Sequence, residues 1–256
     1  MSEKIVSVDR ALDILILLYN NGKEMGVSEI GKALELNKST VHRTLATLEN
    51  KGFVHQNKEN ERYWLGIKLY AMGLLVGEKL SLADLFKPYT KQLFDEFKEV
   101  INVSILDTDS SDGYKSVVIL KEVDNRKTLS INPNIGLSSD VHVSSVGKSL
   151  IAFTKGLDIE KLKNLKKYTE NTITDVDDIL EELEKIRQQG YAIDNEEQEV
   201  GLICIGAPIL GRDGNAIAAM SISGPSARMK QNDFELKIQR LKETIAEINR
   251  VTKQLG

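Results

Sequence analysis

Residues 27–54 read VSEIGKALELNKSTVHRTLATLENKGFV and decide the fold of the N-terminal part of the chain. The beginning of this stretch predicts a short helix, for which Ser28 is the expected N-cap. A turn follows and ends at Asn37, which is expected to cap a longer helix. That helix closes before Gly52, at the position where a left-handed residue ends a helix. Two helices joined by a tight turn are typical of a helix-turn-helix.

The second helix of this pair has two distinct faces. Val41, Leu45 and Leu48 share one face by their spacing and are expected to point into a core. The opposite face carries small and polar residues, namely Ser39, His42, Arg43, Ala46 and Asn50, with Thr40 and Thr47 at its edges. An α-helix fits the major groove of DNA, where an arginine can fork onto guanine or hold a phosphate. The pattern therefore predicts a DNA-recognition helix.

The flanking segments complete a winged helix-turn-helix. An amphipathic helix is predicted upstream by apolar residues at steps of i, i+3, i+4 and i+7, namely Ala11, Ile14, Leu15 and Leu18. It is expected to end at residues 20–22. Downstream, residues 53–55 and 62–65 read as strands joined by a polar turn at 57–61. Three helices followed by a β-hairpin form the winged arrangement.

Basic charge is concentrated locally rather than spread over the chain. The net charge is -4, and the first 66 residues hold nine basic and nine acidic side chains. Residues 37–58, in contrast, hold four basic side chains against Glu49 alone, and local placement decides contact with DNA. The expected DNA contacts are Ser28, Lys38, Ser39, Thr40, His42, Arg43, Thr47, Lys58 and Arg62, the last two on the wing. Similar helix pairs also occur in protein-interaction domains, which is the alternative that periodicity leaves open.

The composition restricts the class of protein. At 256 residues, 41% hydrophobic and 28% charged, the chain is an ordinary soluble globular protein with room for one large or two modest domains. One Cys and three distant His argue against a disulfide framework and a His/Cys metal site, so no metal or cofactor is expected. No apolar run approaches a membrane span and the N-terminus lacks a signal-peptide layout, so we expect a cytoplasmic protein.

After about residue 100, short β-rich runs replace the helical pattern. Strands are expected at 101–106, 115–123, 128–131, 191–193, 202–209 and 216–223, the last two joined by a hairpin turn at 211–215. Helices are expected at 71–86, at 88–98 as an extension of the first or as a separate helix, and at 144–154, 158–168 and 175–189. Thr174 is the expected N-cap of the helix at 175–189 and Gly190 its stop, and a last helix is expected from about Asp233. This order predicts an α+β domain around an antiparallel sheet. We divide the chain into a DNA-binding domain at 1–66, a linker helix at 67–86 and a second domain at 87–256.

Two further patterns in the second region have a structural interpretation. Apolar residues follow heptad-like steps in the last helix, namely Phe234, Ile238, Leu241, Ile245, Ile248 and Leu255. We favour packing of this stripe on the sheet over self-association. Residues 147–149 read Gly-Lys-Ser, as in a phosphate-binding loop, but His142 stands where that motif needs glycine. Nucleotide binding by this route is therefore rejected.

The helix-turn-helix stretch resembles that of the IclR family of bacterial transcription regulators. Residues 63–66, with Leu69 and Gly73, resemble the wing exit and linker helix of that family. Downstream, four segments resemble its effector-binding domain, which is related to GAF and PAS sensor folds: 141–150, 190–197, 201–209 and 219–224. The resemblance therefore covers nearly the whole chain and is much more specific than a lone helix-turn-helix pattern.

The resemblance implies a pocket for a small carboxylate in the second domain. Carried over residue by residue, the pocket positions are Ser145, Val146, Asp194, Cys204, Ser221 and Ser223. Many relatives have Ala or Gly where this chain has Ser145 and Val146, which changes the pocket size. Two serines that alternate on a strand face the same side and can bond an anion, as can the free N–H groups of a helix start. A packing pattern for the serines and a buried, apolar role for Cys204 are the alternatives.

We therefore expect a one-component regulator, and favour a repressor over an activator. Its N-terminal winged helix would bind a palindromic operator as a homodimer, because two recognition helices must lie about 34 Å apart. A tetramer is the alternative assembly. A small organic acid or sugar acid would control its affinity for double-stranded DNA. The runner-up hypothesis is a small-carboxylate sensor or enzyme domain that follows a helical protein-interaction module. The missing nucleophile–base and metal signatures count against that hypothesis.

Overall fold

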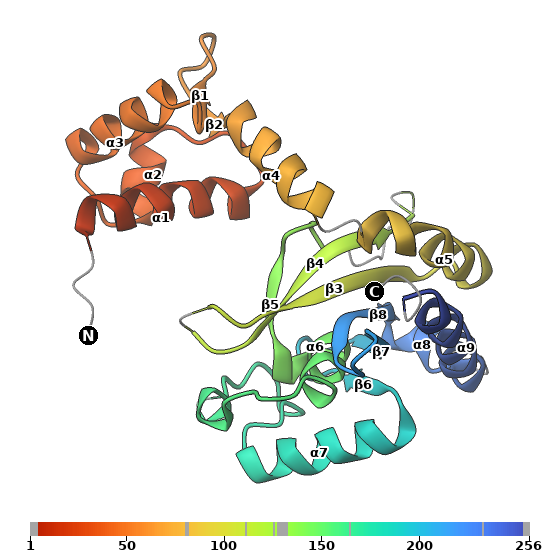
Figure 1. Cartoon of the computed structure of the whole chain (residues 1–256). Helices are drawn as coiled ribbons and strands as arrows, with labels where there is room; N and C mark the ends of the chain where they lie inside the picture. Colours follow the sequence, from red (N-terminus) through yellow and green to blue (C-terminus); the bar gives the residue numbers. More distant parts are fainter. Residues whose placement is uncertain are drawn as a thin grey trace. The chain divides into compact units, whose positions relative to one another are not determined.

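The computed structural model describes residues 5–79, 82–110, 112–124, 126, 133–163, 165–231 and 233–252. The chain forms two compact units, Met1–Ser81 and Leu82–Gly256, which are described one at a time (Figure 1). The predicted strand at 128–131 and Leu255 of the apolar stripe lie outside the described residues.

The N-terminal unit is a winged helix-turn-helix. Its elements are α1 (Val6–Asn21), α2 (Val27–Ala33), α3 (Lys38–Asn50), β1 (Val54–Gln56), β2 (Tyr63–Leu65) and α4 (Ile67–Lys79). Ile14 and Leu18 of α1, Ile30 of α2, and Val41 and Leu45 of α3 are fully buried in one apolar cluster. The predicted split of α3 into an inward apolar face and an outward polar face is therefore confirmed.

The N-cap of α2 differs from the prediction. Gly26 occupies that position, whereas Ser28 lies inside the first turn and is exposed. Glu29 accepts a hydrogen bond from the Gly26 N–H at 2.9 Å, which is the glutamate half of a capping box. A glycine can hold this position because the glutamate three residues later supplies the side-chain bond.

The C-terminal unit is built on a six-stranded antiparallel sheet in the order β5-β4-β3-β8-β7-β6. The strands are β3 (Val100–Asp107), β4 (Lys115–Glu122), β5 (Ser138–Asp140), β6 (Ala192–Asn195), β7 (Leu202–Leu210) and β8 (Ala216–Pro225). The helices are α5 (Leu82–Phe97), α6 (Ser145–Ala152), α7 (Val176–Gln189), α8 (Ser226–Met229) and α9 (Phe234–Thr252). The predicted α+β class is confirmed.

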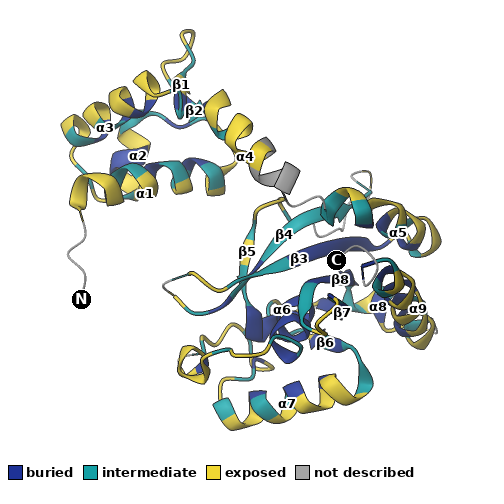
Figure 2. Ribbon diagram, viewed as in Figure 1, coloured by how far each residue is buried: buried dark blue, intermediate teal, exposed yellow. Residues whose placement is uncertain are grey.

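The two faces of the sheet have different chemistry. Apolar residues such as Ile101, Ile205 and Met220 form the core beneath α5 and α9. Figure 2 shows the strands that carry them, β3, β7 and β8, as largely buried. Ile238 and Leu241 of α9 belong to this core, so the stripe packs on the sheet as expected. Helix α6 covers the opposite face, in contact with β3, β6, β7 and β8.

Several predicted helix boundaries were wrong. Among the described residues of the predicted helix at 158–168, only Ile159–Leu162 is helical, and it forms a 3-10 helix. The N–H of Tyr168 instead donates to the Thr172 hydroxyl at 3.1 Å, a side-chain bond that competes with helix. The N-cap of α7 is Asp175 rather than Thr174, because the Asp175 carboxylate accepts from the N–H of Asp177 at 2.8 Å.

The connector and one edge of the sheet also differ from expectation. Helix α5 runs continuously across Pro88, so the predicted linker at 67–86 takes in α4 and the start of α5. The short strand β5, which pairs with β4, was missed because its sequence, Ser-Ser-Asp, has no β signal.

Candidate DNA interface and effector site

The outward face of α3 presents the side chains expected to meet DNA. Lys38, Ser39, His42 and Arg43 are exposed, and Thr40 is half-buried at the edge. Two threonine hydroxyls bond back onto the helix: Thr47 Oγ1 donates to the Arg43 carbonyl and Thr44 Oγ1 to that of Thr40, both at 2.9 Å. The face therefore combines a free guanidinium-bearing side chain with small side chains that allow close approach.

The wing places Lys58 and Arg62 differently. Lys58 is exposed in the turn between β1 and β2. The guanidinium of Arg62 is bound within the unit: Nη2 donates to Glu29 Oε2 at 2.6 Å, and Nε and Nη2 donate to the Glu24 carbonyl at 3.1 and 3.0 Å. These bonds hold Arg62 against the body of the unit and give it a structural role, while its contact with DNA stays a prediction.

Strand register brings four predicted effector residues onto one face of the sheet. Cys204 pairs with Asp194 on β6 and with Ser223 on β8, and Ser221 is two residues from Ser223. Residues that pair directly share a face, as do residues two apart on a strand. This is the face that α6 covers, and Ser145 and Val146 lie at the buried start of that helix. The six residues are thus gathered around one interface between helix and sheet.

The packing at this interface is very close. A Cβ on Gly206 of β7 would lie 2.6 Å from the Ser145 carbonyl carbon, so only glycine allows α6 to approach the strand. The hydroxyls of Ser221 and Ser223 are buried and lie 3.2 Å apart, within hydrogen-bond distance of each other. The Ser144 hydroxyl caps α6 by accepting from the Gly147 N–H at 3.1 Å.

The polar face also holds residues that the sequence analysis missed. Within the described ranges, no hydrogen-bond partner reaches Asn102 Oδ1, Ser104 Oγ, Ser149 Oγ or Asp194 Oδ2, and all four atoms are buried. Asn102 pairs directly with Ser221, so it lies on the same face. Buried polar atoms normally have partners, because an unpaired one costs about 1–3 kcal/mol. The alternation of polar residues at 102 and 104 within an apolar strand was the available signal.

Burial changes the protonation of this face. Desolvation raises the pKa of Asp194 to about 7. The Glu197 N–H, which donates to Asp194 Oδ1 at 2.8 Å, partly opposes this rise because it stabilises the ionised carboxylate. Desolvation also raises the pKa of the Cys204 thiol, with the Asp194 carboxylate beside it as a second cause. A raised thiol pKa keeps Cys204 protonated and unreactive.

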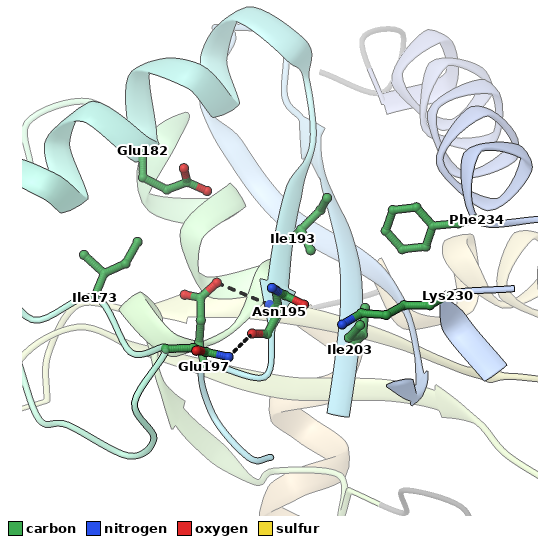
Figure 3. A pocket seen from close by; sticks show the side chains of 9 residues that line it. Ile173, Glu182, Ile193, Asn195, Glu197, Ile203, Lys230 and Phe234 are labelled. Carbon is green, nitrogen blue, oxygen red and sulfur yellow. Dashed lines mark hydrogen bonds between the residues drawn. The ribbon is translucent and has the colours of Figure 1, made fainter. Parts of the chain in front are cut away.

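A cavity of about 560 Å³ lies beside the edge strand β6 (Figure 3). Its lining includes Ile193, Ile203, Phe234, Glu182 and Glu197, and none of the six predicted effector residues. One wall of the cavity contains a buried ion pair between Glu197 and Lys148, the lysine of the Gly-Lys-Ser segment at 147–149. Lys148 is fully buried, and its Nζ donates to both oxygens of Glu197 at 2.6 and 2.8 Å and to the Ile193 carbonyl at 2.7 Å.

Comparison with known proteins identifies the family. Residues 7–58 match the family described as "IclR helix-turn-helix domain", and residues 75–250 match "Bacterial transcriptional regulator IclR C-terminal". The chain belongs to the IclR family. It is a DNA-binding regulator of transcription, as the resemblance implied. Within the described ranges, no helix is long and apolar enough to cross a bilayer, and no three side chains are grouped to hold a metal ion.

Relatives of this IclR-family chain match it over almost its full length. The HTH-type transcriptional regulator KdgR of Escherichia coli (strain K12) is 31% identical over 98% of this chain and 92% of that protein. The HTH-type transcriptional repressor AllR of the same strain is 27% identical over 95% and 89%.

Solved structures share the fold. The crystal structure of the Thermotoga maritima IclR has a TM-score of 0.75 and 31% identity, covering 98% of this chain and 100% of that chain. An IclR homologue from Microbacterium hydrocarbonoxydans, complexed with 4-hydroxybenzoate, has a TM-score of 0.79 and 21% identity over 98% of this chain and all of that chain.

Proposed function

We propose that this regulator is a repressor whose affinity for its operator is controlled by a small organic anion bound on the polar face of the C-terminal sheet. One observation supports the effector part: four buried polar atoms on or against that face have no hydrogen-bond partner among the described residues. A ligand that bonds them recovers the free energy lost by leaving them unpaired. The repressor assignment is supported by AllR, a relative that is named as a repressor.

The chemistry of the face suits a carboxylate that also carries hydroxyl groups. Ser221, Ser223 and the start of α6 offer donors to an anion, since hydroxyls and helix N–H groups stabilise negative charge without a buried cation. Asn102 and Ser104 offer further acceptors for hydroxyl groups. The homologue crystallised with 4-hydroxybenzoate, a hydroxylated carboxylate, supports this class. Val146 and Cys204 would line the apolar part of the site.

On the DNA side, we propose that α3 enters the major groove. Arg43 would bond a base or a phosphate, while Ser39 and Thr40 would permit close approach. Lys38, His42 and Thr47 would contact the DNA strands on either side of the groove. Ser28, at the start of α2, would also contact the DNA. Lys58 would reach the DNA backbone from the wing, and Arg62 would hold the wing in place.

We propose that the regulator binds DNA as a homodimer joined through its N-terminal unit. Exposed apolar side chains follow α4, namely Ile67, Tyr70, Met72 and Leu75. A second exposed apolar stripe follows α1 at helical spacing and consists of Ile5, Val8, Leu12 and Ile16. Apolar stripes of this size on a small unit mark contact surfaces. Such a dimer, or a pair of dimers, would place two recognition helices on one palindrome in the cytoplasm.

A thermal-shift screen of hydroxylated organic acids and sugar acids tests the effector site. A ligand at about 100 times its dissociation constant adds roughly 2.7 kcal/mol of stability to the folded state. The double variant Ser221→Ala with Ser223→Ala should lose this shift and the ligand response while it still binds operator DNA. Normal ligand affinity of the double variant in calorimetry would remove the pocket assignment.

We also propose that the bound anion is an effector and not a substrate, because the relatives are transcription regulators. Incubation of the protein with each acid that shifts its unfolding temperature, followed by chromatography, checks this. Unchanged ligand is the expected result, and product formation would favour an enzyme.

A further inference from the structure

The wing of the DNA-binding unit is fastened by Glu24, a residue in the connection between α1 and α2 for which the sequence pattern predicts no role. Nδ2 of Asn60 donates to Glu24 Oε2 at 2.8 Å, and Nδ2 of Asn57 donates to Oε1 at 3.1 Å. These asparagines stand on either side of the wing tip, where Lys58 is exposed. One carboxylate therefore holds both sides of the tip.

The backbone around Glu24 strengthens this attachment. Met25 forms a bridge with Tyr63 of β2, in which each N–H donates to the other's carbonyl, at 3.0 and 2.8 Å. The Arg62 guanidinium binds the Glu24 carbonyl and the Glu29 carboxylate, which also accepts from the N-cap of α2. The connection between α1 and α2 thus runs along the hairpin and is bonded to it from the strand to the tip.

The recognition helix holds the wing from another side. The N–H of Gln56, the last residue of β1, donates to Glu49 Oε1 of α3 at 3.1 Å. The position of the wing is therefore set relative to both α2 and α3, the elements proposed above to contact DNA.

The charge of Glu24 makes this arrangement informative. Asn60 and Asn57 lower the pKa of Glu24 by donating to its carboxylate, so the group is ionised at neutral pH. A negative charge beside a surface that faces DNA repels phosphate and by itself weakens binding. We propose that Glu24 is a positioning residue, which holds Lys58 in the orientation in which the wing meets the DNA backbone. This inference rests on the wing contact proposed above.

The first test compares two variants that remove the same charge from the same part of the unit. Glu24→Gln keeps the side-chain shape but confronts the asparagine donors with an amide, which breaks part of the attachment. Glu59→Gln removes a carboxylate from the exposed tip. Operator affinity, measured by fluorescence anisotropy, should fall about threefold to tenfold for Glu24→Gln, although a repulsive charge has been removed. It should stay unchanged or rise for Glu59→Gln.

A double-mutant cycle with Lys58→Ala separates positioning from general stability. Lys58→Ala alone should weaken binding and reduce the slope of log affinity against log salt by about 0.9, the value for one phosphate contact. In the Glu24→Gln background, Lys58→Ala should cost little more, because the contact is already lost. A loss of stability alone would leave the two effects additive.

A swapped pair tests the hydrogen bond itself and guards against a variant that fails to fold. Asn60→Asp faces Glu24 with a second carboxylate and should weaken operator binding. The double variant Glu24→Gln with Asn60→Asp has the original net charge, and the amide at position 24 can now donate to the carboxylate at position 60. Operator affinity should therefore recover. Affinity of Glu24→Gln equal to or above wild type, additivity in the cycle, or no recovery in the swapped pair would each overturn the role of Glu24. Lys58→Ala that leaves wild-type affinity unchanged would instead overturn the wing contact.

Discussion

Asp194 shows how burial alters the pKa of one residue of the proposed effector site. Its side chain is fully buried and one of its oxygens has no partner within the described ranges. Burial of a carboxylate disfavours the charged form, which is why the pKa of Asp194 rises to about 7. The charge of Asp194 therefore depends on pH close to neutrality. Asp194 lies on the same face of the sheet as the serine hydroxyls that we propose as hydrogen-bond donors to the anion, with Cys204 of β7 between Asp194 and Ser223.

This raised pKa predicts a pH-dependent stability. Between the ordinary Asp value near 3.9 and pH 7, the folded state holds a proton that the unfolded state has lost, so stability falls as pH rises through this window and levels off above it. Asp194→Asn keeps the acceptor for the Glu197 N–H and cannot ionise. Relative to wild type, it should therefore gain about 2–4 kcal/mol in unfolding free energy between pH 5 and pH 8. Urea unfolding at the two pH values measures this gain, and a constant difference would contradict the raised pKa.

At the scale of elements, the decisive contact is that of α6 with β7. Gly206 lets the helix start approach the strand so closely that a methyl group would meet the Ser145 backbone. This contact encloses the polar atoms of the sheet, so the proposed effector site is a packed interface between helix and sheet.

Adding one methyl group tests this contact. Gly206→Ala should lower the free energy of unfolding by about 1–3 kcal/mol through overpacking, because backbone atoms cannot rotate away. Gly73→Ala is the matched control, since a Cβ there has nothing within 4 Å and alanine favours the α4 helix. Chemical denaturation gives both values. An equal effect of the two variants would show that the packing at Gly206 is looser than described.

Helix α3 and the strands β3 and β8 illustrate what the sequence can and cannot predict. The faces of α3 follow from helical spacing alone, and the serines of β8 from strand alternation. The alternation of Asn102 and Ser104 places both on one face of β3, but their position beside the β8 serines depends on pairing between β3 and β8, which local spacing does not contain. The role of Arg62 was missed for the same reason: its partners Glu24 and Glu29 lie more than 30 residues away in the chain.

For the whole molecule, we propose that the two units have separate tasks and that a homodimer presents two recognition helices. The helix faces of the N-terminal unit and the polar face of the C-terminal unit are each complete within their own unit. A ligand bound in one unit can alter DNA affinity only if it favours one arrangement of the proposed dimer over another.

Charge placed on α4 tests the proposed dimer. Tyr70→Lys with Leu75→Lys puts two charges on an exposed apolar face and should shift the protein toward monomer in sedimentation. Affinity for a full palindrome should fall, while affinity for one half-site stays the same. Val200→Lys, at an equally exposed apolar position of the C-terminal unit, should change neither. A double variant that remains dimeric would place the contact elsewhere.

The most direct test of the account is the affinity of Arg43→Ala for operator DNA at physiological salt, measured by fluorescence anisotropy. Because Arg43 is exposed on the outward face of α3, the variant should fold normally and lose about tenfold or more in affinity. Arg212→Ala, in the exposed hairpin turn of the C-terminal unit, should bind like wild type. Unchanged affinity of Arg43→Ala would contradict the claim that this helix face reads DNA.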